Sequence, residues 1–268
     1  MLTHPAPEGR RARAPLSLRQ EYEDFILQRI EDFKEQLTRA QLLGIADEAV
    51  RELEVGPEGQ LVLTEVLVLE HVDRLIMRRL KLPTYRRWRE RHMRIRRAQQ
   101  DPTHWGLEAD TPLPELAGRL EADDLALVVG ASAAPAAFYL AAHDASVLVI
   151  DNVLAAIEGI ESRASTEALA MRIQAMVVAL GDWFPDVSAA LVVVDAAALA
   201  GLDATTRVRL LDGLRARTAP GGVHVILPPE PRAGVISLAP DALQTHYAGW
   251  RVERGLKGSS RWFLAAKP

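Results

Sequence analysis

The sequence predicts an α/β fold, with a mostly parallel sheet that ends in an antiparallel hairpin, preceded by a helical N-terminal domain. Two changes of pattern along the chain carry this prediction. Apolar residues recur at spacings of three and four over the first 100 residues, as in amphipathic helices. Beyond Pro112 and Pro114, short β-branched runs alternate with helical stretches, and the last two runs flank a glycine-containing loop. Such nearly continuous apolar strands suit a sheet that helices cover on both faces.

The N-terminal region is expected to hold four helices. Ser17 is a candidate N-cap for a helix ending near Gly44, and a short helix follows over Ile45–Leu53. After a turn at 56–59, a third helix covers Leu61–Leu80, and Pro83 precedes an Arg-rich helix from Thr84 to Gln99. The apolar face of the third helix is expected to contain Val62, Val66, Leu69, Val72, Ile76 and Leu80.

The chain therefore divides into four predicted segments: a mobile tail over 1–16, a helical domain over 17–100, a connector over 101–112 and an α/β domain over 113–268. Seven strands are expected in the last segment, at Leu125–Val129, Ser146–Ile150, Ala175–Ala179, Ala189–Val194, Val223–Leu227, Trp250–Arg254 and Arg261–Ala265. The helices expected between them cover Ala134–His143, Val153–Arg163 and Thr205–Thr218.

The composition excludes several classes of protein. Apolar residues make up 49% of the chain and charged residues 25%, values typical of a globular protein and unlike those of a disordered chain. No apolar run reaches the length of a membrane-spanning helix, and the basic N-terminus lacks the apolar core of a secretory signal. We therefore expect a cytoplasmic location. With no cysteine and with scattered histidines, the sequence predicts neither disulfides nor a metal site.

The first two predicted strands carry the pattern of a nucleotide-type site. The first strand leads into the small-residue turn Gly130-Ala131-Ser132-Ala133-Ala134, and the second ends in Asp151, 21 residues after Gly130. A small turn lets backbone approach a ligand, and an acid at the end of the next strand accepts hydrogen bonds from ribose hydroxyls. The competing interpretation of Asp151 is structural, as a cap for the helix that follows it.

Together with Ala219-Pro220-Gly221-Gly222 before the fifth strand and the terminal hairpin, these motifs resemble the class I S-adenosylmethionine-dependent methyltransferases, which have a Rossmann-like seven-stranded sheet. The resemblance covers a little over half of the chain. It implies S-adenosylmethionine as the cofactor, held by Gly130, Ala131, Ser132, Asp151 and Asn152, with Asp182 and Trp183 beside the adenine. Asp195, after the fourth strand, is the weak candidate for orienting an acceptor; no Asn-Pro-Pro-Tyr-type motif identifies that acceptor.

The sequence departs from the family at the glycine-rich loop. Ser132 and Ala134 stand where the family usually has its second and third glycines. Val128 stands two residues before the first glycine, at the position where the family often has an acidic residue. An added Cβ obstructs a loop that must touch a ligand or adopt positive φ. The alternative function is therefore a catalytically silent scaffold or accessory subunit that docks to a larger protein assembly, with a membrane-associated assembly as one option.

Segment 74–97 is the most polarised part of the chain, with 11 basic residues and the single acidic Glu90. Several interpretations remain open: a solvated charged helix, an internal partner for the acidic residues 21–35, a docking surface for a protein partner or anionic surface, and, as the least favoured, a nucleic-acid site. The candidate docking residues are Arg78, Arg79, Arg86, Arg87, Arg94 and Arg97.

Overall fold

The computed structural model describes residues 17–55, 64–121, 124–227, 240–255 and 262–268. The chain forms two compact units that divide between Ile95 and Arg96. The predicted tail over 1–16, the turn at 56–59 and the loop inside the terminal hairpin lie outside the described residues. No helix in the described ranges is long and apolar enough to cross a membrane.

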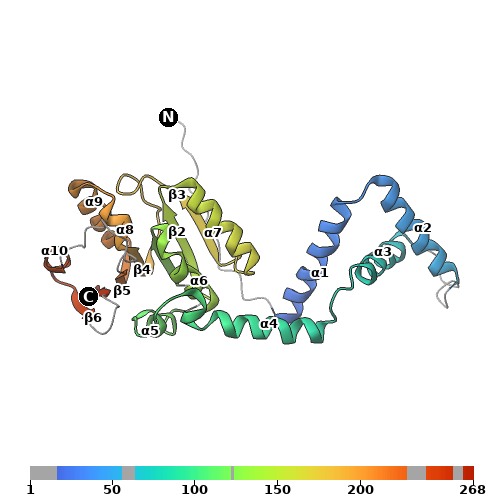
Figure 1. Cartoon of the computed structure of the whole chain (residues 1–268), viewed down its shortest axis with the longest axis horizontal. Coiled ribbons are helices and arrows are strands. Elements are labelled where there is room, and N and C mark those ends of the chain that lie inside the picture. Colours follow the sequence, from blue (N-terminus) through green and yellow to red (C-terminus); the bar gives the residue numbers. More distant parts are fainter. Residues whose placement is uncertain (1–16, 56–63, 122–123, 228–239, 256–261) are drawn as a thin grey trace. The chain divides into compact units, whose positions relative to one another are not determined.

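The first unit is helical, as expected, and consists of α1 (Leu18–Glu35), α2 (Arg39–Val55), α3 (Glu65–Arg79) and most of α4 (Tyr85–Gln99) (Figure 1). Each helix contributes to one core, where Ile26 and Ile30 from α1 meet Ile45, Ile76 and Trp88. Ser17 caps α1 in a capping box with Gln20, as its sequence position predicts.

The prediction of one helix from Ser17 to Gly44, followed by a short helix over Ile45–Leu53, is wrong. The first helix ends at Glu35, and α2 runs continuously from Arg39 to Val55. The break arises because Thr38 and Gln41 form a second capping box: the Thr38 hydroxyl accepts from the Gln41 amide at 3.3 Å, and the Gln41 side chain accepts from the Thr38 amide at 2.8 Å.

The third helix also differs from its predicted form. It begins at Glu65, with Thr64 as the N-cap. Residues 61–63, where the helix was expected to begin, lie outside the described residues. Val72 and Ile76 are buried as expected, whereas Val66 and Leu69 are exposed. The helix is amphipathic only over its second half, where it packs against α1 and α2.

The second unit contains a seven-stranded sheet in the order β3-β2-β1-β4-β5-β7-β6. The first five strands are parallel, and β7 runs antiparallel between β5 and β6. This confirms the predicted mostly parallel sheet with a terminal hairpin. The strands are β1 (Leu125–Val129), β2 (Ser146–Asp151), β3 (Ile173–Val177), β4 (Ala189–Asp195), β5 (Thr218–Leu227), β6 (Arg251–Gly255) and β7 (Trp262–Ala266).

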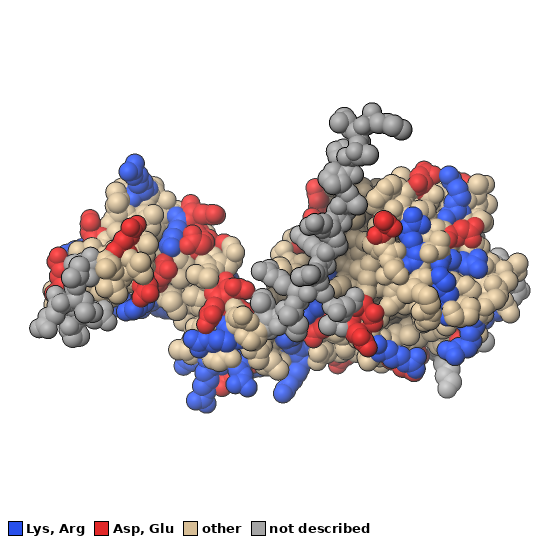
Figure 2. Space-filling model, turned by 180° about the vertical axis from the view of Figure 1, so that it is seen from behind, with Lys and Arg blue, Asp and Glu red and all other residues tan. Residues whose placement is uncertain are grey.

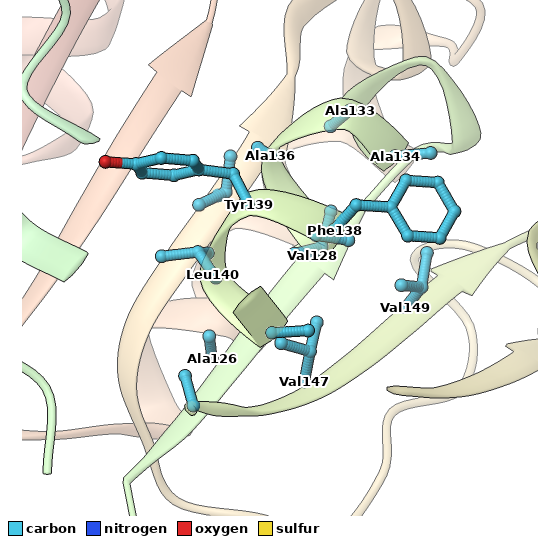
Figure 3. Packing of buried hydrophobic residues seen from close by; sticks show 14 of the residues in the cluster. Ala126, Val128, Ala133, Ala134, Ala136, Phe138, Tyr139, Leu140, Val147 and Val149 are labelled. Carbon is cyan, nitrogen blue, oxygen red and sulfur yellow. The ribbon is translucent and has the colours of Figure 1, made fainter. Parts of the chain in front are cut away.

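Alternate residues of the central strands face two different hydrophobic cores. On one face, Ala126 and Val128 pack beneath α5 (Leu113–Ala117), α6 (Ala134–Ala142) and α7 (Leu154–Thr166). Figure 3 shows α6 lying over β1 and β2, with Phe138 beside Val149. On the other face, Leu127 and Val129 contact α8 (Ala196–Ala200), α9 (Ala204–Ala216) and α10 (Pro240–His246). Helices therefore cover both faces of the sheet.

Two predicted elements of this unit need correction. β3 begins at Ile173, two residues before the expected start. The Pro220-Gly221-Gly222 segment was expected as a turn before the fifth strand, but it lies within β5, where the register to β4 shifts between Ala189 and Leu191. Gly221 takes a φ of +74° there, which suits a bulge. The predicted connector contains a short 3₁₀ helix, Pro102–Trp105.

Candidate functional site

The candidate site lies at the carboxyl ends of β1, β2 and β4. These strands are neighbours and parallel, so the residues that end them, Gly130, Asp151 and Asp195, meet at one edge of the sheet. In open α/β sheets this edge is where ligands bind, because the loops that leave neighbouring strands diverge there. Of the sequence-predicted site residues, Gly130, Ala131, Ser132, Asp151, Asn152 and Asp195 are brought together.

Gly130 is the one position of the loop that requires glycine for its conformation. Its φ is +95°, and a Cβ built on it would lie 2.8 Å from the Cβ of Ala198 and 3.0 Å from the Cβ of Asp195. The chain then forms a 3₁₀ turn over Ala131–Ala133 and enters α6 at Ala134, whose φ of −53° is helical. Ser132 also lacks a positive φ. The two residues that replace the usual glycines therefore adopt ordinary backbone conformations.

Asp151 joins the two loops that follow β1 and β2. Its Oδ2 accepts a hydrogen bond from the Ala131 amide at 2.6 Å, and its Oδ1 accepts one from the Val153 amide at 2.7 Å. The side chain of Val153, the N-cap of α7, makes no cap hydrogen bond. Asp151 thus holds backbone on both sides, and because each carboxylate oxygen can accept twice, it keeps acceptor capacity toward a ligand.

Asp195 sits below the loop, at the end of β4. Its Oδ1 accepts from the Ala197 amide at 2.8 Å, which makes Asp195 the N-cap of α8. The residue is buried beside Gly130. A short Ala-rich helix directly after an aspartate is a recognisable N-cap pattern, although α8 was not predicted.

A cavity of about 330 Å³ opens among these residues. This volume is at the lower end of the range for small-molecule sites. Besides the six predicted residues, the cavity is lined by Val153, Ala156, Leu180, Ala197, Ala198, Gly201 and Leu202. The lining combines apolar surface with two carboxylates, and it contains no basic side chain from the described part of the chain.

Asp182 and Trp183 lie outside this lining. Asp182 forms an ion pair with Arg209 of α9 at 3.0 Å, and Trp183 is exposed. The turn at Gly181, with a φ of +87°, packs against Thr206, where an added Cβ would come within 2.6 Å. From this connection, Leu180 is the residue that reaches the cavity.

The predicted docking arginines fall into two groups. Arg78 and Arg79, at the end of α3, pair with Glu52 and Glu48 of α2. Arg86, Arg87, Arg94 and Arg97 are exposed along α4, and Arg86 pairs with Glu90 of the same helix at 3.2 Å.

No protein-family model matches the chain, and a search of curated protein sequences finds no match. Several solved structures are similar. TehB from Haemophilus influenzae is 16% identical, and the match covers 58% of this chain and 61% of TehB with a TM-score of 0.49. The glycopeptide N-methyltransferase MtfA complexed with S-adenosyl-L-methionine is 16% identical, with coverages of 58% and 92% and a TM-score of 0.46. N-methyltransferase NodS from Bradyrhizobium japonicum, in complex with S-adenosyl-L-homocysteine, is 22% identical, with coverages of 66% and 97% and a TM-score of 0.46.

The strand order and the antiparallel β7 give the second unit the fold of class I S-adenosylmethionine-dependent methyltransferases. The predicted resemblance to this superfamily is thereby confirmed at the level of the fold. Chemically, the arrangement offers a small-residue loop, two buried acids and an apolar wall around one cavity. Such a cavity suits a ligand that combines hydroxyl donors, positive charge and an apolar ring.

Proposed function

We propose that the chain is an S-adenosylmethionine-dependent methyltransferase that binds its cofactor in the cavity at the ends of β1, β2 and β4. The observation that carries the proposal is the buried Asp151 carboxylate, which faces this cavity from the end of β2 while it holds the Ala131 amide of the loop after β1. This hydrogen bond joins the loop after β1 to the acid at the end of β2, and a nucleoside-containing ligand needs both on neighbouring parallel strands.

The residues of the cavity fit the proposed cofactor. The remaining acceptor capacity of Asp151 suits the ribose hydroxyls, with Asn152 beside it. The backbone of Ala131 and Ser132 faces the part of the cavity assigned to the methionine moiety, and Val153, Ala156 and Leu180 offer an apolar wall for the adenine ring. Asp182 and Trp183 lie outside the lining, so the proposal does not use them.

The charge of the lining favours this cofactor over a dinucleotide. Asp151 and Asp195 are both buried and no Lys, Arg or His from the described residues lines the cavity. A sulfonium and an ammonium group would be attracted to the two carboxylates. Asp151 does not discriminate between the cofactors, because dinucleotide sites also carry an acid at the end of the second strand, but Asp195 beside Gly130 would repel a pyrophosphate bound at the turn. Electrostatics therefore argue against a nicotinamide-dependent oxidoreductase on the same sheet.

When bound, S-adenosylmethionine supplies an electrophilic methyl group. The chain's own contribution is to orient the reactants, and the buried Asp195 at the mouth of β4 is the residue that we assign to hold a hydrogen-bond donor of the acceptor. Its Oδ1 is fixed by the Ala197 amide, so the carboxylate has a defined direction. The acceptor itself is left unassigned.

The test is calorimetric titration of the full chain with S-adenosylmethionine, S-adenosylhomocysteine and, for comparison, NAD. We expect micromolar binding of the first two, a loss of about 100-fold or more in Asp151→Ala, which corresponds to nearly 3 kcal/mol, and unchanged binding in Asp186→Ala, an exposed acid outside the lining. Because Asp151 also holds two amides, circular dichroism must show that the variant is folded. A folded wild type that binds neither compound at about 1 mM would refute the proposal and leave the silent scaffold.

A further inference from the structure

The solvent-facing side of α4 is an exposed arginine surface, in which Arg86 pairs with Glu90 of the same helix. We define the basic face as Arg86, Arg87, Arg91 and Arg94, all of which are exposed. At 100° per residue these side chains span about 140° of the helix surface, along the flank beside Trp88, which is buried in the core of the helical unit. Like charges three and four residues apart destabilise a helix, so this face opposes the stability of α4.

The acidic side chains of α1 were one predicted partner for these arginines, and the structure shows little such pairing. Glu23 pairs with Arg19 and Glu31 with Lys34, so these acids meet cations of their own helix. Between α1 and α4, His92 contacts Glu21 at 3.0 Å.

A complementary surface exists on the outer side of α1. The acidic face consists of Asp24, Glu31 and Glu35, which are exposed and lie seven and four residues apart on one side of the helix. Asp24 and Glu31 have the same separation as Arg87 and Arg94, which is seven residues or about 10.5 Å along a helix. Figure 2 shows several Lys and Arg side chains of this unit along its lower edge, while others lie higher up among Asp and Glu.

An exposed aliphatic side chain adjoins each charged face. Leu27, three residues after Asp24, is 54% exposed, and Ile95, four residues after Arg91, is 41% exposed. Charged pairs give direction to an association, whereas buried aliphatic groups add affinity. Each face therefore combines the two components of a small protein interface.

The charge balance of the helical unit favours a partner of its own kind. Residues 17–95 carry 14 basic and 15 acidic side chains, so the unit is nearly neutral while its two charges are segregated. A nearly neutral unit with an acidic face has no general attraction for a nucleic acid or another polyanion. In addition, Trp88 is buried, so its ring is not available for stacking with nucleic-acid bases. A second copy, by contrast, presents the matching charges.

We propose that the chain self-associates through contact of the basic face of α4 in one copy with the acidic face of α1 in another. The association is electrostatic in large part and therefore weakens with salt. It is independent of cofactor binding, because neither face includes a residue of the cavity.

Sedimentation velocity of the full chain at 50 and 500 mM NaCl tests the proposal first. We expect concentration-dependent association at low salt, with a dissociation constant at least about 10-fold weaker at high salt. The triple variant Arg87→Glu/Arg91→Glu/Arg94→Glu and the double variant Asp24→Lys/Glu35→Lys should each be monomeric at low salt. The control Arg39→Glu/Arg119→Glu/Arg251→Glu changes the net charge as much as the triple variant does, at exposed positions outside both faces, and should associate like the wild type.

Mixing the two face variants is the decisive step. The reversed α4 of one variant then meets the reversed α1 of the other, so the mixture should associate although each variant alone does not. A wild type that stays monomeric at low salt would overturn the proposal, as would association that survives both reversals or a mixture that remains monomeric. A different outcome would assign α4 to a polyanion: nucleic acid copurifies with the wild type but not with the Arg variant, and the protein freed of nucleic acid is monomeric. This outcome would also overturn the proposal.

Discussion

Replacing Gly130 with alanine tests the packing of the loop that borders the cavity. The φ of +95° disfavours any L-residue, at a cost of about 1–2 kcal/mol. The new Cβ would also lie 2.8 Å from the Cβ of Ala198 and 3.0 Å from that of Asp195, and forcing a group into packed surroundings costs about 1–3 kcal/mol. The free energy of unfolding should therefore fall by about 2–5 kcal/mol.

Gly249→Ala is the matched control for this experiment. Gly249 has a φ of +86°, close to that of Gly130, but an added Cβ there would meet nothing within 4 Å. The control thus carries the backbone cost alone, about 1–2 kcal/mol. The difference between the two variants isolates the steric cost of approaching Asp195 and Ala198.

Urea denaturation followed by circular dichroism measures both variants. At about 2–4 °C per kcal/mol for a chain of this size, Gly130→Ala should also lower the melting temperature by roughly 4–20 °C. Equal destabilisation of the two variants would refute the close contact of Gly130 with the start of α8. An unchanged stability of Gly130→Ala would refute the positive φ as well.

Three further predictions concern stability outside the cavity. Gly44 lies inside α2 with open space around it, so Gly44→Ala should raise the free energy of unfolding by about 0.5–1 kcal/mol in urea; a decrease would contradict the continuous helix. Burial lowers the pKa of His224 from 6.5 to about 3. As the pH falls, His224 is therefore protonated in the unfolded state before it is protonated in the folded state. The free energy of unfolding falls by about 1.4 kcal/mol per pH unit as the pH drops from 6.5 toward the folded-state pKa of about 3. In urea titrations between pH 7 and 4, the free energy of unfolding of His224→Gln should depend less on pH than that of the wild type. The same pH dependence in both proteins would exclude His224 as the cause. Arg163 lies over the rings of Trp105 and Phe138, so Arg163→Met should cost about 1 kcal/mol or more in urea and Arg163→Lys less; equal losses would argue against the cation–π contact.

The sequence predicts the sheet well because its strands carry their own signal. β1 and β2 are interior strands of the sheet, and their apolar runs begin and end close to the predicted residues. The strand-end positions of Gly130 and Asp151 follow from these boundaries. A local pattern therefore suffices wherever burial on both faces determines the residue types.

Other features depend on contacts that the sequence does not display. Nothing near Asp182 indicates that it pairs with Arg209 of α9 and lies outside the lining of the cavity. The break after α1 is different. The residues of its capping box, Thr38 and Gln41, can be recognised in the sequence, but the apolar spacing continues across them and favours a single helix. Capping residues should therefore be weighed before periodicity when two helices follow each other closely.

The unusual loop is best judged by conformation rather than by its count of glycines. A glycine can be required because φ is positive or because a Cβ would collide with neighbouring atoms. Gly130 meets both conditions within the protein itself, whereas Ser132 has no positive φ and Ala134 begins α6 with helical dihedrals. The Asp151 carboxylate holds the turn through the Ala131 amide, so the loop does not depend on further glycines for its shape. The replacement of two glycines is therefore compatible with a loop that approaches a ligand through its backbone, and binding measurements on Ser132→Gly would reveal whether the remaining side chain restricts that approach.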